Sequence, residues 1–94
     1  MITISKSKAE YNSVKILIKG HSQADICSAV SSVAYTCINI LLEYDPTWVI
    51  VEDNKEDDYL LILITKTDYL VELVMKVMFQ MFKDIEEQVP TGSI

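Results

Sequence analysis

The chain has 94 residues, half of them hydrophobic, which suffices for one domain with a single modest core. All eight basic residues are lysines and they oppose 14 acidic residues, so the net charge is −6. Because arginine pairs best with phosphates and guanine edges, its absence argues against direct nucleic-acid binding, and the acidic balance favours a positively charged partner.

The first 20 residues carry the alternation of a β-hairpin. Ile2 and Ile4 open the chain, and apolar side chains recur at every second position over residues 14–18 after a polar turn at residues 10–13. Gly20 should end the second strand, since glycine permits the sharp change of direction that follows.

A helical period begins at Ile26 and continues to about Glu43. Asp25 precedes it, where a helix N-cap is expected. Pro46 cannot continue the helix and biases Asp45 towards an extended conformation. The residues expected on the buried face are Ile26, Val30, Val33, Cys37, Ile40 and Leu41.

Two strand-like runs follow, "TWVIVE" and "YLLILIT", joined by the acidic segment "DNKEDD". They predict a second hairpin whose acidic turn is solvated. The second run is apolar on both faces, as is typical of a central strand.

The last element is a helix from about Thr67 to Gln88, capped by Thr67 or Asp68. Its apolar stripe is wider than a small sheet needs, so part of the stripe is expected at a dimer interface. Residues 90–94 are expected to form a flexible tail. The stripe comprises Leu70, Val74, Met75, Val77, Met78, Phe79, Met81 and Ile85.

The order strand, strand, helix, strand, strand, helix predicts an α/β (α+β) fold, in which two β-hairpins form a four-stranded sheet with two helices. We expect one domain over residues 1–94.

Cys27 and Cys37 fall on the same predicted helix, ten residues and about 15 Å apart. Because a disulfide tolerates only about 6 Å, both should be thiols. Thiols, no N-terminal signal segment and no apolar run near 20 residues favour a cytoplasmic protein without a membrane span. One histidine and two cysteines so placed make no metal site, and no cofactor is expected.

His21 and Cys27 are the candidate catalytic pair. Cys27 falls in the first helical turn, where unpaired amides favour a thiolate, and a short loop lets the His21 imidazole reach its sulfur. The histidine could act as general base and then general acid, while the same amides stabilise an oxyanion. Spacing alone favours a second interpretation: a buried small cysteine and a solvated turn histidine.

Three neighbouring residues have alternative roles. Ser31, four residues after Cys27, could bond the histidine or the thiolate, or only a helix carbonyl. Asp25 could orient His21 or only cap the helix. Cys37 lies on the apolar face and is expected in the core.

The segment "GHSQADICSAVSS" resembles the signature of the Prp-type ribosomal-processing cysteine proteases, which are small bacterial proteins. In these proteins a strand ends in Gly-His, and a loop then leads to Asp, Cys and a Ser four residues beyond the Cys. The length and the order of elements of this chain are also similar to that family, so the resemblance covers essentially the whole chain.

The resemblance implies a homodimeric cysteine protease that removes a short N-terminal extension from a large-subunit ribosomal protein. It implies that Cys27 is the nucleophile, His21 the base, Gly20 the turn residue and Ser31 a supporting residue. The loop after His21 is shorter than in typical members, and Asp25 stands two residues before Cys27 instead of three. An alternative is therefore a catalytically silent dimeric module that binds ribosomal proteins.

Overall fold

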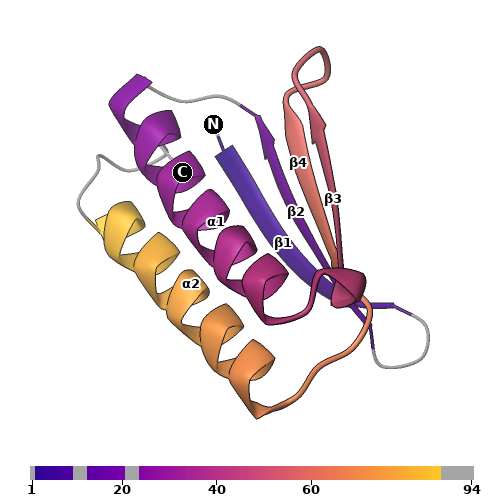
Figure 1. Ribbon diagram of the computed structural model, residues 1–94. Helices are drawn as coiled ribbons and strands as arrows, with labels where there is room; N and C mark the ends of the chain where they lie inside the picture. The colour runs from indigo at the N-terminus through magenta and orange to yellow at the C-terminus, as the bar shows by residue number, and fades with distance from the viewer. Residues whose placement is uncertain (1, 10–12, 21–23, 88–94) are drawn as a thin grey trace.

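A computed structural model describes residues 2–9, 13–20 and 24–87 of the chain (Figure 1). Its elements follow the predicted order, with one addition, a short 3₁₀ helix between α1 and β3. The elements are β1 (Ile2–Lys8), β2 (Val14–Gly20), α1 (Ala24–Tyr44), η2 (Pro46–Trp48), β3 (Val49–Asn54), β4 (Tyr59–Ile64) and α2 (Tyr69–Glu87).

The four strands form one antiparallel sheet in the order β1-β2-β4-β3. Each predicted hairpin is present, and the two hairpins are joined side by side through β2 and β4, with Val14 opposite Ile64. The prediction that the "YLLILI" strand is central is confirmed, because β4 lies between β2 and β3.

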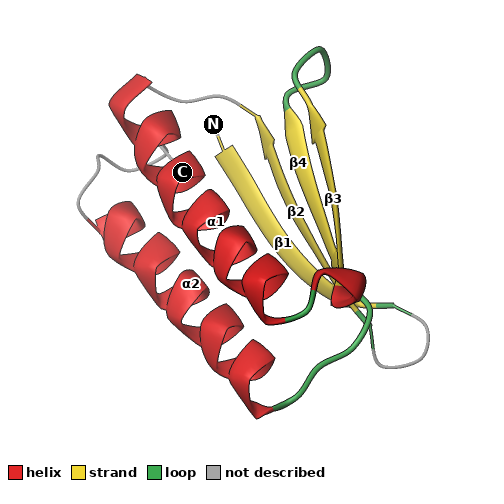
Figure 2. Ribbon diagram, viewed as in Figure 1, coloured by secondary structure: helices red, strands yellow, loops and turns green. Residues whose placement is uncertain are grey.

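Both helices lie on the same face of the sheet, side by side, so the molecule has two layers (Figure 2). The core fills the space between them, and its most deeply buried side chains include Ile16, Ile62, Ile64, Met78 and Val71. Burial of each such side chain contributes about 2 kcal/mol to folding. The predicted ββαββα fold class is confirmed.

The buried faces of the helices differ in detail from the predicted ones. In α1, Ile40 is 45% exposed, and Ala34 and Ile38 are buried in its place. In α2 the buried residues include Val71 and Phe82, which the expected stripe omitted. The expected stripe omitted Val71 and Phe82 because α2 packs against α1 as well as over the sheet, and sequence periodicity does not give the direction of either neighbour.

The ends of the helices test the predicted caps. α1 begins at Ala24, so Asp25 lies inside its first turn and the prediction that Asp25 is the N-cap is wrong; its carboxylate accepts from the adjacent Ile26 amide at 3.0 Å. Asp68 caps α2 as expected, since its carboxylate accepts from the Val71 amide at 3.0 Å. Asp45 is extended, as predicted, and caps η2.

α1 is long and apolar enough to cross a membrane by length and composition alone, with 21 residues and a mean hydropathy of 1.5. The expectation that the chain has no apolar run near 20 residues was therefore wrong. A core helix passes the same test, and α1 buries a full face against the sheet, so we interpret it as a core helix.

Candidate active site

Gly20 ends β2 at one end of the sheet. Its φ angle is 106°, in the region that glycine adopts without a Cβ clash. Its amide donates to the Asp58 carbonyl at 2.9 Å, which ties the end of β2 to the β3–β4 hairpin. The prediction that Gly20 ends the second strand is thus confirmed. His21, the next residue, lies outside the described residues.

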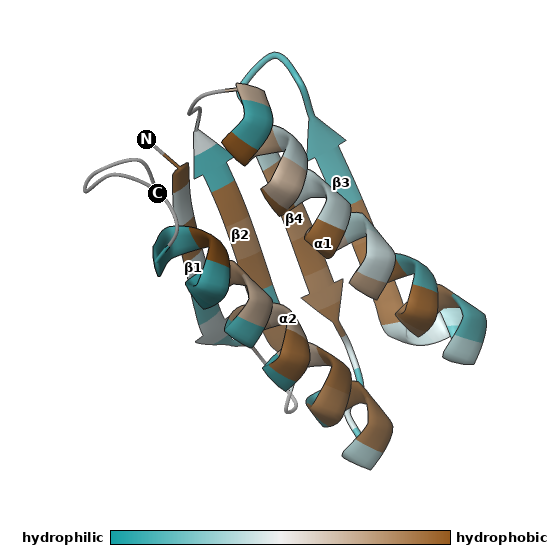
Figure 3. Cartoon of the chain, turned by 90° about the vertical axis from the view of Figure 1, so that its left-hand side faces the viewer, coloured by the Kyte–Doolittle hydropathy of each residue, from teal (hydrophilic) through white to brown (hydrophobic). Residues whose placement is uncertain are grey.

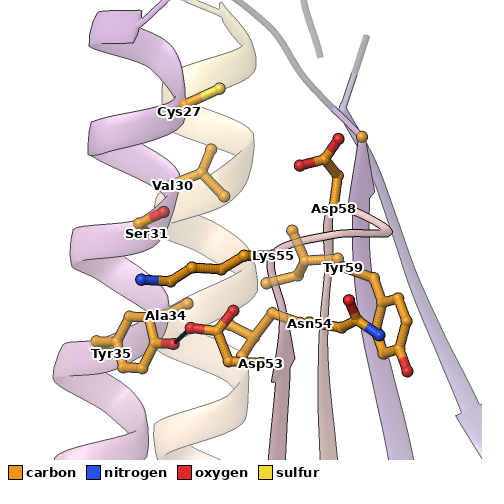
Figure 4. A pocket seen from close by; sticks show the side chains of 13 residues that line it. Cys27, Val30, Ser31, Ala34, Tyr35, Asp53, Asn54, Lys55, Asp58 and Tyr59 are labelled. Carbon is orange, nitrogen blue, oxygen red and sulfur yellow. Dashed lines mark hydrogen bonds between the residues drawn. The ribbon is translucent and has the colours of Figure 1, made fainter.

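Cys27 lies in the first turn of α1, as predicted, near the same end of the sheet. It is half-buried and packs against the core, so only part of its surface reaches solvent. Its side chain points towards the β3–β4 hairpin (Figure 4). Amides of a first helical turn have no partner within the helix, and they face any negative charge that forms there.

A groove with a volume of about 230 Å³ separates this part of α1 from the sheet. Three elements form it: the first half of α1, the end of β2, and the β3–β4 hairpin. The lining residues used below are Gly20, Cys27, Ser31, Tyr35, Asp53, Lys55 and Asp58.

One wall of the groove is a line of side chains on α1. Cys27, Ser31 and Tyr35 are spaced four residues apart, so they lie one above another on the same side of the helix (Figure 4). Ser31 is exposed and lies one turn from Cys27. The wall therefore carries a thiol, a hydroxyl and a phenol in sequence along the groove.

The opposite wall is the hairpin, which carries more acidic than basic side chains. Asp53 and Asp58 line it together with a single cation, Lys55. The Tyr35 hydroxyl donates to the Asp53 carboxylate and joins the two walls at one end of the groove. This hydrogen bond raises the pKa of Tyr35, since ionising the phenol would remove the donated proton beside a carboxylate.

The structure thus brings Gly20, Cys27 and Ser31 to one groove. Asp25 is exposed and does not line it. Cys37 is in the core, as expected, where burial raises the pKa of its thiol. In the described part of the chain, no three His, Cys, Asp or Glu side chains gather as a metal site would require.

Sequence reasoning missed Tyr35 and Asp53 as groove residues. The spacing of four that linked Cys27 to Ser31 reaches Tyr35 at the next step, so a signal for it was present. Asp53 was interpreted as part of a solvated turn, whereas it lies at the end of β3 facing α1. Only the tertiary placement of the hairpin reveals its role.

The family model described as "Cysteine protease Prp" matches residues 1–92. Two solved structures of the essential ribosomal processing protease Prp from S. aureus share this fold. The one with a covalently linked product peptide has a TM-score of 0.77 and 18% identity, with 94% of this chain and 90% of that chain covered. The one with a substrate peptide has a TM-score of 0.78 and 17% identity, with 94% and 91% covered. A comparison with curated proteins gave no match.

Proposed function

This chain belongs to the cysteine protease Prp family, and on that premise we propose that it cleaves a short N-terminal extension from a large-subunit ribosomal protein. The observation that carries the proposal is the groove that contains both Cys27 and Gly20. Gly20 is covalently bonded to His21, so the proposed base is attached to a residue that lines the same groove as the proposed nucleophile.

The proposed reaction is acyl transfer to Cys27. His21 takes the proton from the Cys27 sulfur, and the thiolate attacks the carbonyl carbon of the scissile peptide bond. First-turn amides of α1 stabilise the oxyanion, and His21 returns the proton to the leaving amine. A thioester to Cys27 remains. Water then attacks it with His21 as base, which releases the new carboxylate and restores the thiol.

The surroundings of the groove support a basic substrate. Asp53 and Asp58 lie on its hairpin wall, and the whole chain carries a net charge of −6. A positively charged segment would be attracted to this wall. The S. aureus relatives were solved with a substrate peptide and a product peptide, and both share this fold.

The test is incubation of the protein with the ribosomal proteins of its own cell, followed by mass spectrometry of the new N-termini. We expect a new terminus on one large-subunit protein with the wild type, and none with Cys27→Ala or His21→Ala. Cys37→Ala is the matched control, because Cys37 is buried away from the groove. A terminus that persists with Cys27→Ala would contradict the proposed nucleophile.

The second candidate function is a catalytically silent dimeric module that binds ribosomal proteins. The short segment between Gly20 and α1, only residues 21–23, favours it, because a base needs room to reach both the sulfur and the leaving group. Tight binding of the extension peptide by the wild type without any cleavage would select this function.

We also propose that the protein acts as a homodimer in the cytoplasm. α2 supports the dimer, because three large apolar side chains spaced four residues apart remain exposed on it: Leu73, Val77 and Met81.

A further inference from the structure

β3 forms one edge of the described sheet, since it pairs only with β4. The other edge is β1. The main-chain groups on the outer side of an edge strand can pair with another extended chain, so each edge is a potential docking site for a peptide.

The hydrogen-bond pattern shows which groups of β3 point outward. The Thr65 amide donates to the Trp48 carbonyl at 2.7 Å, directly beyond the pair Val49–Ile64. Because antiparallel pairs alternate, the main-chain groups of Ile50 and Glu52 point towards β4, and those of Val51 and Asp53 point away from it.

An independent bond gives the same alternation. The Gly20 amide donates to the Asp58 carbonyl. In the same register, the main-chain N–H and C=O groups of the even-numbered residues of β4 point towards β2. The main-chain groups of the odd-numbered residues of β4 therefore point towards β3, in agreement with the Thr65–Trp48 bond.

The outward side of β3 borders the groove. Asp53 lines the groove, and its side chain reaches Tyr35 on α1, so the outward main-chain groups of Asp53 lie at the rim of the groove that Cys27 also lines (Figure 4). Val51 precedes Asp53 on the same outward side of β3. No residue of β1 lines the groove. Only one of the two edges is thus placed to present a peptide to the thiol.

The two edges also differ in charge. β3 carries Glu52 and Asp53, and the turn after it adds three more carboxylates against Lys55. The charged residues of β1 are both lysines, Lys6 and Lys8. A basic peptide is attracted to β3 and repelled by β1, while the acidic residues oppose pairing of β3 with a second copy of itself.

We infer that the peptide substrate binds as a fifth strand along β3, hydrogen-bonded to the main chain of Val51 and Asp53. The inference rests on the proposed function and specifies how that substrate is held. Main-chain pairing fixes the peptide in an extended form beside the Tyr35 end of the groove, with alternate side chains of the peptide turned towards α1. Cys27 lies eight residues, or about 12 Å, from Tyr35 along α1, so the scissile bond belongs to the part of the peptide that continues past Asp53.

The test compares two proline substitutions. Val51→Pro removes an outward amide without touching the β3–β4 ladder. Ile4→Pro is the matched control, because Ile4 is also a half-buried apolar residue near the middle of an edge strand. The Ala9 amide donates to the Ser13 carbonyl in the β1–β2 register, so the amides of even-numbered β1 residues, including Ile4, point outward. We expect Val51→Pro to lower kcat/KM for the extension peptide by about tenfold, the effect of one lost hydrogen bond, and Ile4→Pro to leave it within about twofold.

A peptide scan decides the matter if Val51→Pro does not fold. Single N-methylation along the extension peptide should weaken binding to Cys27→Ala at every second residue, because only alternate amides of an added strand face β3. Uniform effects along the peptide would overturn the inference and leave the proposed cleavage intact. Alternating binding without wild-type cleavage would overturn the proposed cleavage and support strand addition, and a peptide neither bound nor cleaved would overturn both.

Discussion

The two cysteines have opposite surroundings on one helix. Cys27 lines a groove at the N-terminal turn of α1, where main-chain amides have no partner within the helix. Cys37 lies in the core, where burial raises the pKa of its thiol and disfavours the reactive thiolate. The same residue type is thereby suited to reaction at one position and to packing at the other.

We expect iodoacetamide to label Cys27 at least about tenfold faster than Cys37 near neutral pH. The thiolate is the reactive form, and burial disfavours the thiolate of Cys37. His21→Ala should slow the labelling of Cys27 and leave that of Cys37 unchanged. Mass spectrometry of digested protein over time measures both rates. Equal, slow labelling of the two thiols would contradict an activated Cys27.

Single residues were predicted best where local geometry decides their position. Cys27, Cys37 and Gly20 follow from helical period and turn chemistry, and the structure places them as expected. Asp25 was misplaced because a helix start shifts by one or two residues without changing the pattern. The Asp53–Tyr35 contact joins segments 18 residues apart, and no local rule determines it.

At the scale of elements, one hydrogen bond links the ends of the two helices. The Tyr44 hydroxyl in the last turn of α1 donates to the carboxylate of Asp68, the residue that caps α2. This bond lowers the pKa of Asp68, helped by the Val71 amide, and raises the pKa of Tyr44. Asp68 therefore holds the C-terminal end of α1 beside the N-terminal end of α2.

Asp68→Ala should lower the melting temperature by a few degrees, since it removes the cap of α2 and the acceptor of Tyr44. Asp68→Asn keeps the side-chain oxygen that caps α2, so its melting temperature should fall by less than that of Asp68→Ala. Because the folded pKa of Asp68 is depressed, its contribution is present above the ordinary carboxyl pKa and disappears as pH falls through the lowered value.

Calorimetry of the three proteins from neutral to acidic pH measures these differences. The gap between wild type and Asp68→Asn should close towards acidic pH. A gap that persists when the carboxyl is protonated would show that its charge has no part in holding the helices together.

The existence and type of the six predicted elements follow from periodicity, and all six are present. Periodicity failed for parts of the buried faces: Ile40 is exposed, and Val71 and Phe82 are buried although the expected stripe omits them. Which side chains are covered depends on how two helices share one small sheet.

At the scale of the whole molecule, the outer surface of the helical layer is unusually apolar. Figure 3 shows hydrophobic segments recurring along α2, which lies in front of the sheet in that view. Leu73, Val77 and Met81 remain between about 40% and 45% exposed. Such a stripe on a small protein is typical of an interface, here proposed to bind a second copy.

We expect the wild type to sediment at twice the chain mass of 10.7 kDa at micromolar concentration. Val77→Lys should shift it towards the monomer, because a charge would be buried in an apolar interface. Lys83→Glu is the control, because Lys83 is exposed and lies about 120° round the same helix from Val77. A wild type that is monomeric, or a dimer unaffected by Val77→Lys, would contradict the proposed interface.

The bond between Gly20 and Asp58 has a consequence for the order of folding. It belongs to the β2–β4 ladder, whose partners are 38 or more residues apart in sequence, with α1 and β3 between them. Closing so large a loop is slow compared with forming either hairpin or a helix. The groove needs that ladder, since its walls come from β2, α1 and the second hairpin. A nascent chain that has released only its first hairpin and α1 from the ribosome therefore carries Cys27 without a groove, and proteolytic activity must await the release of β4.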